Sequence, residues 1–194
     1  MANPATDDRA LVGARIRRVR QQMRLSAAEL GRRLGISTSA VSQIERGVMQ
    51  PSVARLIAIT DALGVPLSFV LSDGRATHSD GYAIERAEDA ASVELSGGVR
   101  FRRLAPAESP GVDYFESVYP PGQAATTKDH FFRHEGYEVG QIISGELTID
   151  FIDEIVVLRQ GDTISYPCEK PHRLHNAGTE DAVARWLIVH PPHA

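Results

Sequence analysis

The sequence predicts two domains of different class, a five-helix domain followed by an all-β domain. Helical periodicity runs through residues 1–71, whereas the chain beyond residue 81 breaks into short β-branched and aromatic runs separated by turn residues. The length of 194 residues accommodates two hydrophobic cores of ordinary size. Charge divides at the same place. Residues 1–71 carry ten arginines and five acidic side chains, about +5, whereas residues 72–194 carry 11 basic and 20 acidic side chains, about −9.

This charge asymmetry indicates an anionic partner for the first domain only, with nucleic acid as the leading candidate. An ordinary solvated helix face would give the same surplus of arginine, so charge alone leaves that alternative open. Membrane insertion is not expected, because no apolar run approaches the roughly 18 residues needed to span a bilayer. The N-terminus has no apolar stretch before a cleavage site, and the single cysteine, Cys168, cannot form an internal disulfide. A cytoplasmic location is therefore expected.

The first helix is expected over LVGARIRRVRQQM, which starts at residue 11 and places its apolar residues on one stripe with arginines elsewhere. The stripe comprises Leu11, Ile16, Val19 and Met23. Ser26 then caps a second helix, AAELGRRL, which Gly35 ends. The third helix, SAVSQIER, follows at once, with Ser37 or Thr38 as its cap and Gly47 after it.

Two short helices joined by the tight turn LGIS have the geometry of a helix-turn-helix, whose second helix lies in the major groove. Small polar side chains on the first two turns of that helix would meet the bases. They are Thr38, Ser39, Ser42 and Gln43. Apolar side chains on the opposite face would pack the helix inward, namely Ala40, Val41 and Ile44.

A fourth helix, VARLIAITDAL, begins after Ser52 and ends at Gly64, and a short fifth, PLSFVL, starts at Pro66. The next stretch, SDGRATHSDG, lacks apolar periodicity and is rich in Ser, Asp and Gly. That composition is typical of a linker, so residues 72–81 are expected to join the two domains.

The stretch LSAAELGRRLGISTSAVSQIERGVMQPS resembles the Xre/Cro-type repressor family, and the resemblance covers roughly residues 9–71. It implies a five-helix domain that binds double-stranded DNA. The family's DNA-contacting positions fall on Thr38, Ser39 and Gln43 for bases and on Arg46 and Ala27 for phosphates. Ala27 departs from the family pattern because it offers only a backbone N–H. The resemblance also implies a salt bridge between Arg20 of the first helix and Glu45 of the third.

The second domain is expected to be an antiparallel β-sandwich or barrel, because short strand-like runs are separated by turn residues. These runs are VRFRRL, VDYFESVY, YEVGQIIS, ELTIDF, IVVLRQ, TISYP and ARWLIVH. Two motifs among them resemble the cupin family. The first comprises His134, Glu138 and Gly145, and the second comprises Gly161, Pro167, His172 and Asn176. The resemblance implies a small jelly-roll β-barrel over residues 82–192.

The same motifs suggest a ligand site inside this barrel. On a regular strand His134 and Glu138 share one parity and face the same side, and His172 joins them from a later strand. Two imidazoles and a carboxylate suit Zn, Fe, Mn or Ni. The family's usual first histidine is replaced by Phe132, and the glycine of the second motif by Glu169. These departures put a four-ligand site in question.

Several alternatives stay open for this site. His130 could supply the missing ligand through a bent strand, or lie on the surface. In a metal-free pocket the polar trio would hydrogen-bond an organic effector, with Phe132 as an apolar wall. Aromatic residues that could line such a pocket are Tyr114, Phe115, Tyr119 and Tyr137. Cys168 is either an ordinary buried thiol or a redox sensor.

Together the two resemblances are those of an Xre-family regulator with a cupin sensor domain. They imply a one-component transcription factor, with repression the expected mode, whose cupin domain senses a small molecule or metal. Such a protein is expected to be a homodimer on a pseudo-palindromic operator, with effector binding shifting the spacing of the two reading helices. The alternative is a metal-dependent cupin dioxygenase or isomerase with an accessory DNA-binding domain. The DNA-binding module argues against it.

Overall fold

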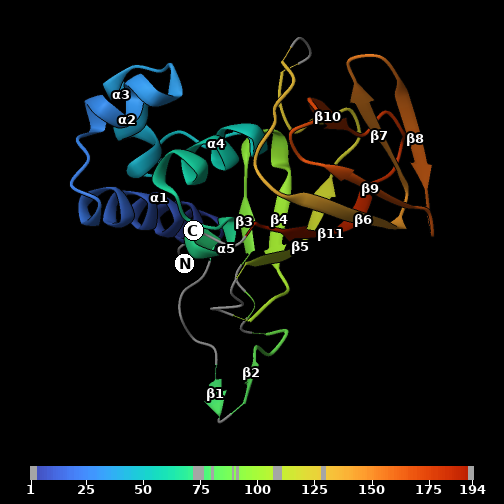
Figure 1. Ribbon diagram of the computed structural model, residues 1–194, viewed down its shortest axis with the longest axis horizontal. Helices are drawn as coiled ribbons and strands as arrows, with labels where there is room; N and C mark the ends of the chain where they lie inside the picture. Colours follow the sequence, from blue (N-terminus) through green and yellow to red (C-terminus); the bar gives the residue numbers. More distant parts are fainter. Residues whose placement is uncertain are drawn as a thin grey trace.

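The computed structural model contains a helical domain and a two-sheet β-barrel packed side by side (Figure 1). The structure describes residues 4–71, 77–79, 81–88, 90, 92–106, 111–127 and 130–191, without the side chains of residues 4–10, 68 and 77–79. The predicted order of an α-helical domain followed by an all-β domain is confirmed. No helix in these ranges combines the length and the apolar character needed to cross a membrane.

Within the described residues, five α-helices form the first domain. They are α1 (Pro4–Gln22), α2 (Ala27–Leu34), α3 (Thr38–Glu45), α4 (Val53–Leu63) and α5 (Leu67–Leu71). The side chains of Ser26, Ser37 and Ser52 each accept a backbone N–H from the first turn of α2, α3 and α4, respectively. Gly35 and Gly64 end α2 and α4 at φ 64° and 63°, in the left-handed region that glycine adopts without strain.

The buried face of α1 differs from the predicted stripe. Ile16 and Val19 are buried as expected, but Leu11 and Met23 are exposed and Val12 is buried instead. Positions 12, 16 and 19 follow the i, i+4, i+7 pattern of one helix face, from which position 11 is one residue out of step. Met23 lies beyond the last residue of α1, so helical periodicity no longer directs its side chain inward.

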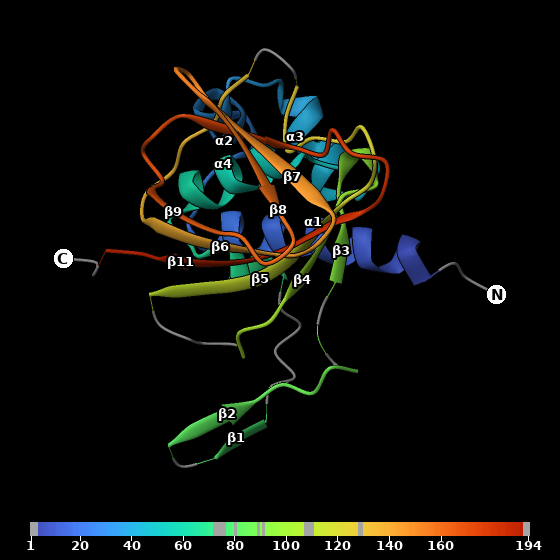
Figure 2. The same cartoon turned by 90° about the vertical axis from the view of Figure 1, so that its right-hand side faces the viewer.

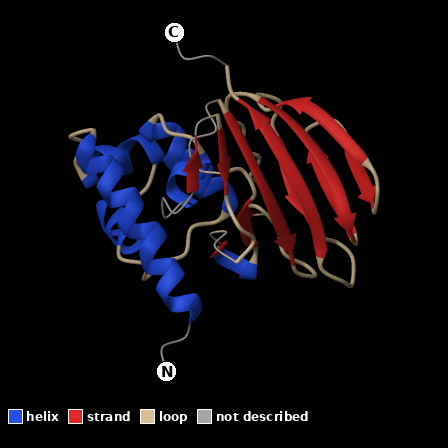
Figure 3. Ribbon diagram, turned by 90° about the horizontal axis from the view of Figure 1, so that it is seen from below, coloured by secondary structure: helices blue, strands red, loops and turns tan. Residues whose placement is uncertain are grey.

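The strands of the second domain form two antiparallel sheets that face each other. The strands are β3 (Ser92–Glu94), β4 (Arg100–Arg103), β5 (Val112–Tyr119), β6 (Tyr137–Ser144), β7 (Glu146–Phe151), β8 (Ile155–Arg159), β9 (Thr163–Pro167), β10 (His172–His175) and β11 (Ala182–Val189). One sheet has the order β3-β4-β5-β11-β6-β9 and the other the order β10-β7-β8 (Figures 2 and 3). Alternate residues of β5 and β11 are buried between the sheets, which is the period of two expected of half-buried strands. The predicted jelly-roll barrel is confirmed.

The predicted linker is partly structured. Strand β1 (Thr77–Ser79) pairs with β2 (Tyr82–Ile84) as a short antiparallel hairpin that projects away from both domains (Figure 2). Residues 72–76 and 80 of the expected linker lie outside the described residues. Because the hairpin packs against neither sheet of the barrel, it adds no wall to the interior site.

Hydrogen bonds join the two domains, in addition to the segment of chain that connects them. The backbone N–H of Ala54 in α4 donates to the carbonyl of Ala125 at 3.1 Å. The backbone N–H of Leu67, which opens α5, donates to the carboxylate of Asp113 in β5 at 3.0 Å. The side chain of Gln50 donates to the carbonyl of Glu94 at 3.1 Å. These bonds fix α4 and α5 on the barrel, and α4 lies between the barrel and the helices α2 and α3 (Figure 1).

Candidate functional site

Helices α2 and α3 are joined by a turn that holds them in one rigid unit. The N–H of Ile36 donates to the carbonyl of Gly31 at 2.9 Å, and a Cβ at Gly31 would crowd the Ile36 carbonyl. Glycine is therefore required where the turn folds back against α2. Val41 and Ile44 are buried, so the opposite face of α3 is turned away from the helical core.

The structure gathers the predicted DNA-contacting residues on or beside this unit. Thr38, Ser39 and Arg46 are exposed, while Ser42, Gln43 and Ala27 are half-buried. The Gln43 amide donates to the Ser39 hydroxyl at 3.4 Å, which is long for a hydrogen bond and leaves the amide available to a base edge. Ala27 is the first residue of α2, where a backbone N–H has no partner within the helix.

A buried ion pair orients α3 against α1. Arg20 Nε lies 2.5 Å from Glu45 Oε1, and Arg20 Nη2 lies 2.9 Å from Glu45 Oε2. The helices can approach because residue 13 is glycine, since a Cβ there would overlap the carbonyl oxygens of Ile44 and Glu45. The salt bridge that the Xre/Cro resemblance implied is present.

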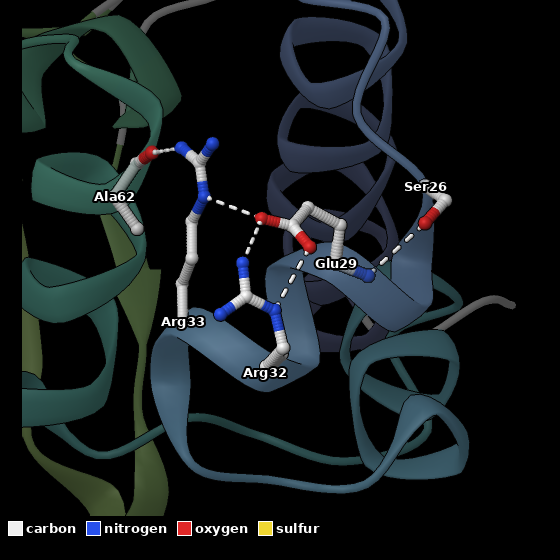
Figure 4. A network of polar contacts seen from close by, with 5 residues as sticks. All are labelled: Ser26, Glu29, Arg32, Arg33 and Ala62. Atoms are coloured by element: carbon white, nitrogen blue, oxygen red, sulfur yellow. Dashed lines mark hydrogen bonds and ion pairs between the residues drawn. The ribbon is translucent and has the colours of Figure 1, made fainter.

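A polar network links α2 to α4 (Figure 4). Ser26 accepts the N–H of Glu29, whose carboxylate accepts hydrogen bonds from Arg32 and Arg33. Arg33 also donates to the carbonyl of Ala62 in α4 at 3.1 Å. The network therefore connects α4 to α2, the helix that precedes α3.

Inside the barrel, Glu138 and His134 face the same space from different local structures. Glu138 lies on an inward position of β6, and its carboxylate accepts a hydrogen bond from the Tyr166 hydroxyl at 2.8 Å. His134 precedes the strand, because Gly136, at φ 115°, bends the chain before β6 begins. His134 is buried like Glu138, as predicted, although it lies before the regular strand. Its backbone N–H donates to the carbonyl of Cys168, which holds it over the barrel interior.

His172 completes the predicted trio from the first position of β10. Its side chain is fully buried, and its Nδ1 lies 2.8 Å from the carbonyl of Lys170. A carbonyl accepts only, so Nδ1 carries the proton and Nε2 keeps its lone pair. Nε2 has no hydrogen-bond partner in the described structure and lies 3.9 Å from Glu138 Oε2. Such an unpartnered buried nitrogen is costly unless something binds it.

Burial favours the uncharged forms of His134, Glu138 and His172. It raises the pKa of Glu138 to about 7, an effect that the Tyr166 hydroxyl partly opposes. Burial also lowers the pKa of His172 to about 4 and lowers the pKa of His134. At neutral pH both imidazoles are neutral, which is the form that binds metals.

The trio lines a small cavity that both domains enclose. Its volume for a water-sized sphere is about 10 Å³, which is room for about one water molecule or ion. Val53 and Ile57 of α4 form one wall. The rest of the lining comes from the barrel and consists of Phe101, Phe115, Tyr119, Phe132, His134, Glu138, His172, Leu174 and Trp186.

Some of the residues predicted to line a pocket lie at this cavity, and others do not. Phe132 is buried, and its ring lies against that of His172 at an angle of 58°, with ring centroids 4.4 Å apart. Tyr114 and Tyr137 were expected in the pocket but lie outside it. Tyr114 takes an outward position of β5, and Tyr137 is 47% exposed on β6. His130 is also exposed and does not reach the cavity.

Cys168 is a candidate ligand that the sequence did not single out. One ligand atom from each of His134, Glu138 and Cys168 lies within 4.8 Å of the others, and all three residues are buried. The cysteine follows β9, far from the first motif in the chain, so only the pairing of β6 with β9 shows the proximity. A cysteine between the proline and the histidine of the second motif was the one available hint.

Comparison with known proteins agrees with this architecture. The Helix-turn-helix family model matches residues 16–70, and the Cupin domain model matches residues 115–190. The chain is 26% identical over 189 residues to the HTH-type transcriptional regulator PuuR of Escherichia coli (strain K12), covering 96% of this chain and 98% of that protein. It is 36% identical over 76 residues to an uncharacterized transcriptional regulator of Rhodospirillum rubrum, covering 36% of this chain and 70% of that one.

A solved structure shares the whole fold. The crystal structure of an HTH_3 family transcriptional regulator from Vibrio cholerae superposes with a TM-score of 0.69 at 20% identity. The superposition covers 96% of this chain and 99% of that one. The likeness therefore extends over both domains.

Proposed function

The chain belongs to the helix-turn-helix transcriptional regulators and carries a C-terminal cupin domain, and from this premise we propose that it represses transcription under the control of a ligand in the barrel. In this proposal a homodimer binds a pseudo-palindromic operator through two copies of α3. Thr38, Ser39, Ser42 and Gln43 contact bases. Arg46 and the N-terminus of α2 at Ala27 contact phosphates.

The single observation that carries the proposal is the position of α4. Val53 and Ile57 of this helix share one cavity with His134, Glu138 and His172. The cavity admits a particle of about the size of one water, so an organic ligand at the trio would have to displace part of the lining, of which α4 forms one wall. The Arg33 bond to Ala62 and the Arg55 bond to the carbonyl of Leu34 tie α4 to α2. Ligand binding thereby changes the presentation of the reading helix.

We further propose that the trio binds one divalent transition metal, for which Zn, Fe, Mn and Ni are the candidates. The orphaned Nε2 of His172, the neutral imidazoles and the ion-sized space all fit such a metal. The backbone bonds of both histidines orient the rings, as outer partners of metal-binding histidines do. A bound metal would hold together the segments that supply its ligands, or would attract an effector by its charge.

We assign the barrel a sensing role rather than a catalytic one. Apart from the trio and the Tyr119 hydroxyl, the described lining of the cavity is apolar, and α4 forms one of its walls. An enzyme would need an open position for substrate, whereas the space beside the trio is about the size of one water.

The test of this function places a larger side chain on α4 where this helix lines the cavity. An Ile57→Trp variant should push α4 from the barrel as a ligand would, and should change operator affinity by about tenfold or more. The operator is first obtained by selecting random DNA on the full-length protein. The control is Val157→Trp, which adds the same ring to the exposed face of β8. Equal operator affinity for wild type and both folded variants would contradict the coupling between cavity and DNA.

A further inference from the structure

The loop that carries Cys168 brings a thiol close to His134 and Glu138, two polar residues that line the barrel cavity. The N–H of Cys168 donates to the carbonyl of Gly136 at 2.9 Å, and its carbonyl accepts the N–H of His134 at 3.2 Å. These two bonds join the segment after β9 to the segment before β6. They place Sγ of Cys168 within 4.8 Å of one ligand atom of His134 and one of Glu138.

A second and independent observation indicates a ligand beside Glu138, whose Oε2 lies 3.9 Å from Nε2 of His172. The Nε2 atom of His172 is fully buried and has no hydrogen-bond partner in the described structure, while Nδ1 is engaged by the Lys170 carbonyl. Its lone pair therefore faces the cavity that His134 and Glu138 also line. An ordinary core thiol has apolar neighbours, whereas Cys168 lies beside an imidazole and a carboxylate.

We propose that Cys168 is a ligand of the barrel metal, which makes the site a thiolate centre with His134, Glu138 and His172. The inference rests on the metal site of the proposed function and adds to it a residue outside the cupin motifs. It also accounts for Phe132, the departure from the first motif. The ligand missing at residue 132 is replaced by a sulfur from the opposite segment.

The composition of this set selects the metal. Two nitrogens, one oxygen and one thiolate favour Zn²⁺ over the harder Mn²⁺, which prefers oxygen-rich sites. Binding replaces the S–H bond by a metal–sulfur bond and releases one proton to solvent. Because burial raises the pKa of the free Cys168 thiol, the metal-free site holds a neutral thiol, and metal binding is what produces the thiolate.

The experiment uses metal-stripped, untagged, full-length protein titrated with Co²⁺ as a spectroscopic substitute for Zn²⁺. Wild type should bind one equivalent and develop a near-ultraviolet sulfur-to-cobalt charge-transfer band beside the visible bands of bound cobalt. Cys168→Ser should keep visible bands, lose the charge-transfer band and bind Zn²⁺ at least about tenfold more weakly. Its affinity for Mn²⁺ should change little.

Two outcomes separate this inference from the function on which it rests. Cobalt bound by wild type without a charge-transfer band would overturn the role of Cys168 while leaving the trio as a metal site. No cobalt bound at all would overturn both. The wild-type spectrum decides the question even if the variant fails to fold. A sulfur neighbour in the X-ray absorption spectrum of the Zn²⁺-loaded wild type should give the same answer.

Discussion

Arg20 of α1 and Glu45 of α3 form a two-bond ion pair across the helical domain, with both side chains buried. Arg20 Nη1 also donates to the carbonyl of Leu25 at 2.7 Å. The pair thereby joins α1, the start of the α2 segment and the end of the reading helix. Because Glu45 is the last residue of α3, the pair sets the direction in which that helix leaves the core.

Replacing Glu45 by Ala should destabilise the helical domain strongly. The change leaves the Arg20 guanidinium buried beside one remaining carbonyl, and removing one partner of a buried pair costs about 3 to 5 kcal/mol. Urea unfolding followed by circular dichroism measures the loss. The control is Arg32→Ala, because Arg32 pairs with Glu29 while 75% exposed, and exposed pairs contribute about 1 kcal/mol or less. Equal losses of unfolding free energy in the two variants would show that the buried ion pair stabilises the domain no more than the exposed one.

Replacing Gln43 by Ala should relax sequence preference at one operator position. A side chain that reads one base edge contributes about 1 to 3 kcal/mol on the cognate site and little elsewhere. Replacing the exposed Arg46 by Ala should weaken binding to operator and random DNA alike and reduce the salt dependence of both. Fluorescence anisotropy on the selected operator and on single-position variants separates the two effects. If both substitutions left every affinity unchanged, α3 would not be the reading helix.

The local features of the helical domain could be predicted from sequence because they depend on neighbouring residues. Ser26, Ser52, Gly35 and Gly64 take the capping positions that their residue types favour. Ser37, one of two predicted caps, is the residue that caps α3. The motif residues His134, Glu138 and His172 were likewise found together, since each follows a recognisable spacing.

The contacts that join distant segments could not be predicted in this way. The bend at Gly136 changes how His134 reaches the interior, and strand alternation alone cannot foresee it. Tyr137 seemed suitable for the pocket by residue type, but the register of β6 turns it outward. Ile57 belongs to the DNA-binding domain by sequence, and its place in the wall of the cupin cavity appears only when the domains are packed.

Replacing Gly140 by Ala should destabilise the barrel, although Gly140 lies on an ordinary strand. A Cβ at this inward position of β6 would overlap the ring of Trp186, which is buried and held by a hydrogen bond from Nε1 to Ser117 at 2.9 Å. The ring would have to shift to admit the Cβ, and overpacking of this kind costs about 1 to 3 kcal/mol. Intrinsic Trp fluorescence should shift together with the urea midpoint. Val139→Ala, on the exposed face of the same strand, is the control and should leave the fluorescence of Trp186 unchanged.

Removing the His190 side chain should lower the stability of the protein at acidic pH and should reduce the fall in stability as the pH rises above 6.5. The Asp113 carboxylate accepts the hydrogen bond of His190 Nε2 at 2.8 Å and also the N–H of Leu67 at the start of α5. The hydrogen bond to Asp113, aided by the charges of Asp113, Asp61 and Glu135, raises the pKa of His190. The charged pair therefore stabilises the folded protein fully below the unfolded value of 6.5 and is lost as pH rises through the higher folded value.

The measurement is the urea midpoint of wild type and of His190→Gln across pH 5.5 to 8.5, roughly the range in which histidines titrate. The difference between the two proteins should be largest at the acidic end and should shrink as pH rises. The charge of His190 also lowers the pKa of Asp61 and of His134, so the difference between the two proteins includes these smaller effects of the same charge. Burial raises the pKa of Asp61 to about 6. This group therefore also makes the protein less stable as the pH rises, but in the lower range between its ordinary pKa of 3.8 and about 6. A difference that stayed constant, or grew with pH, would mean that His190 is not charged against Asp113.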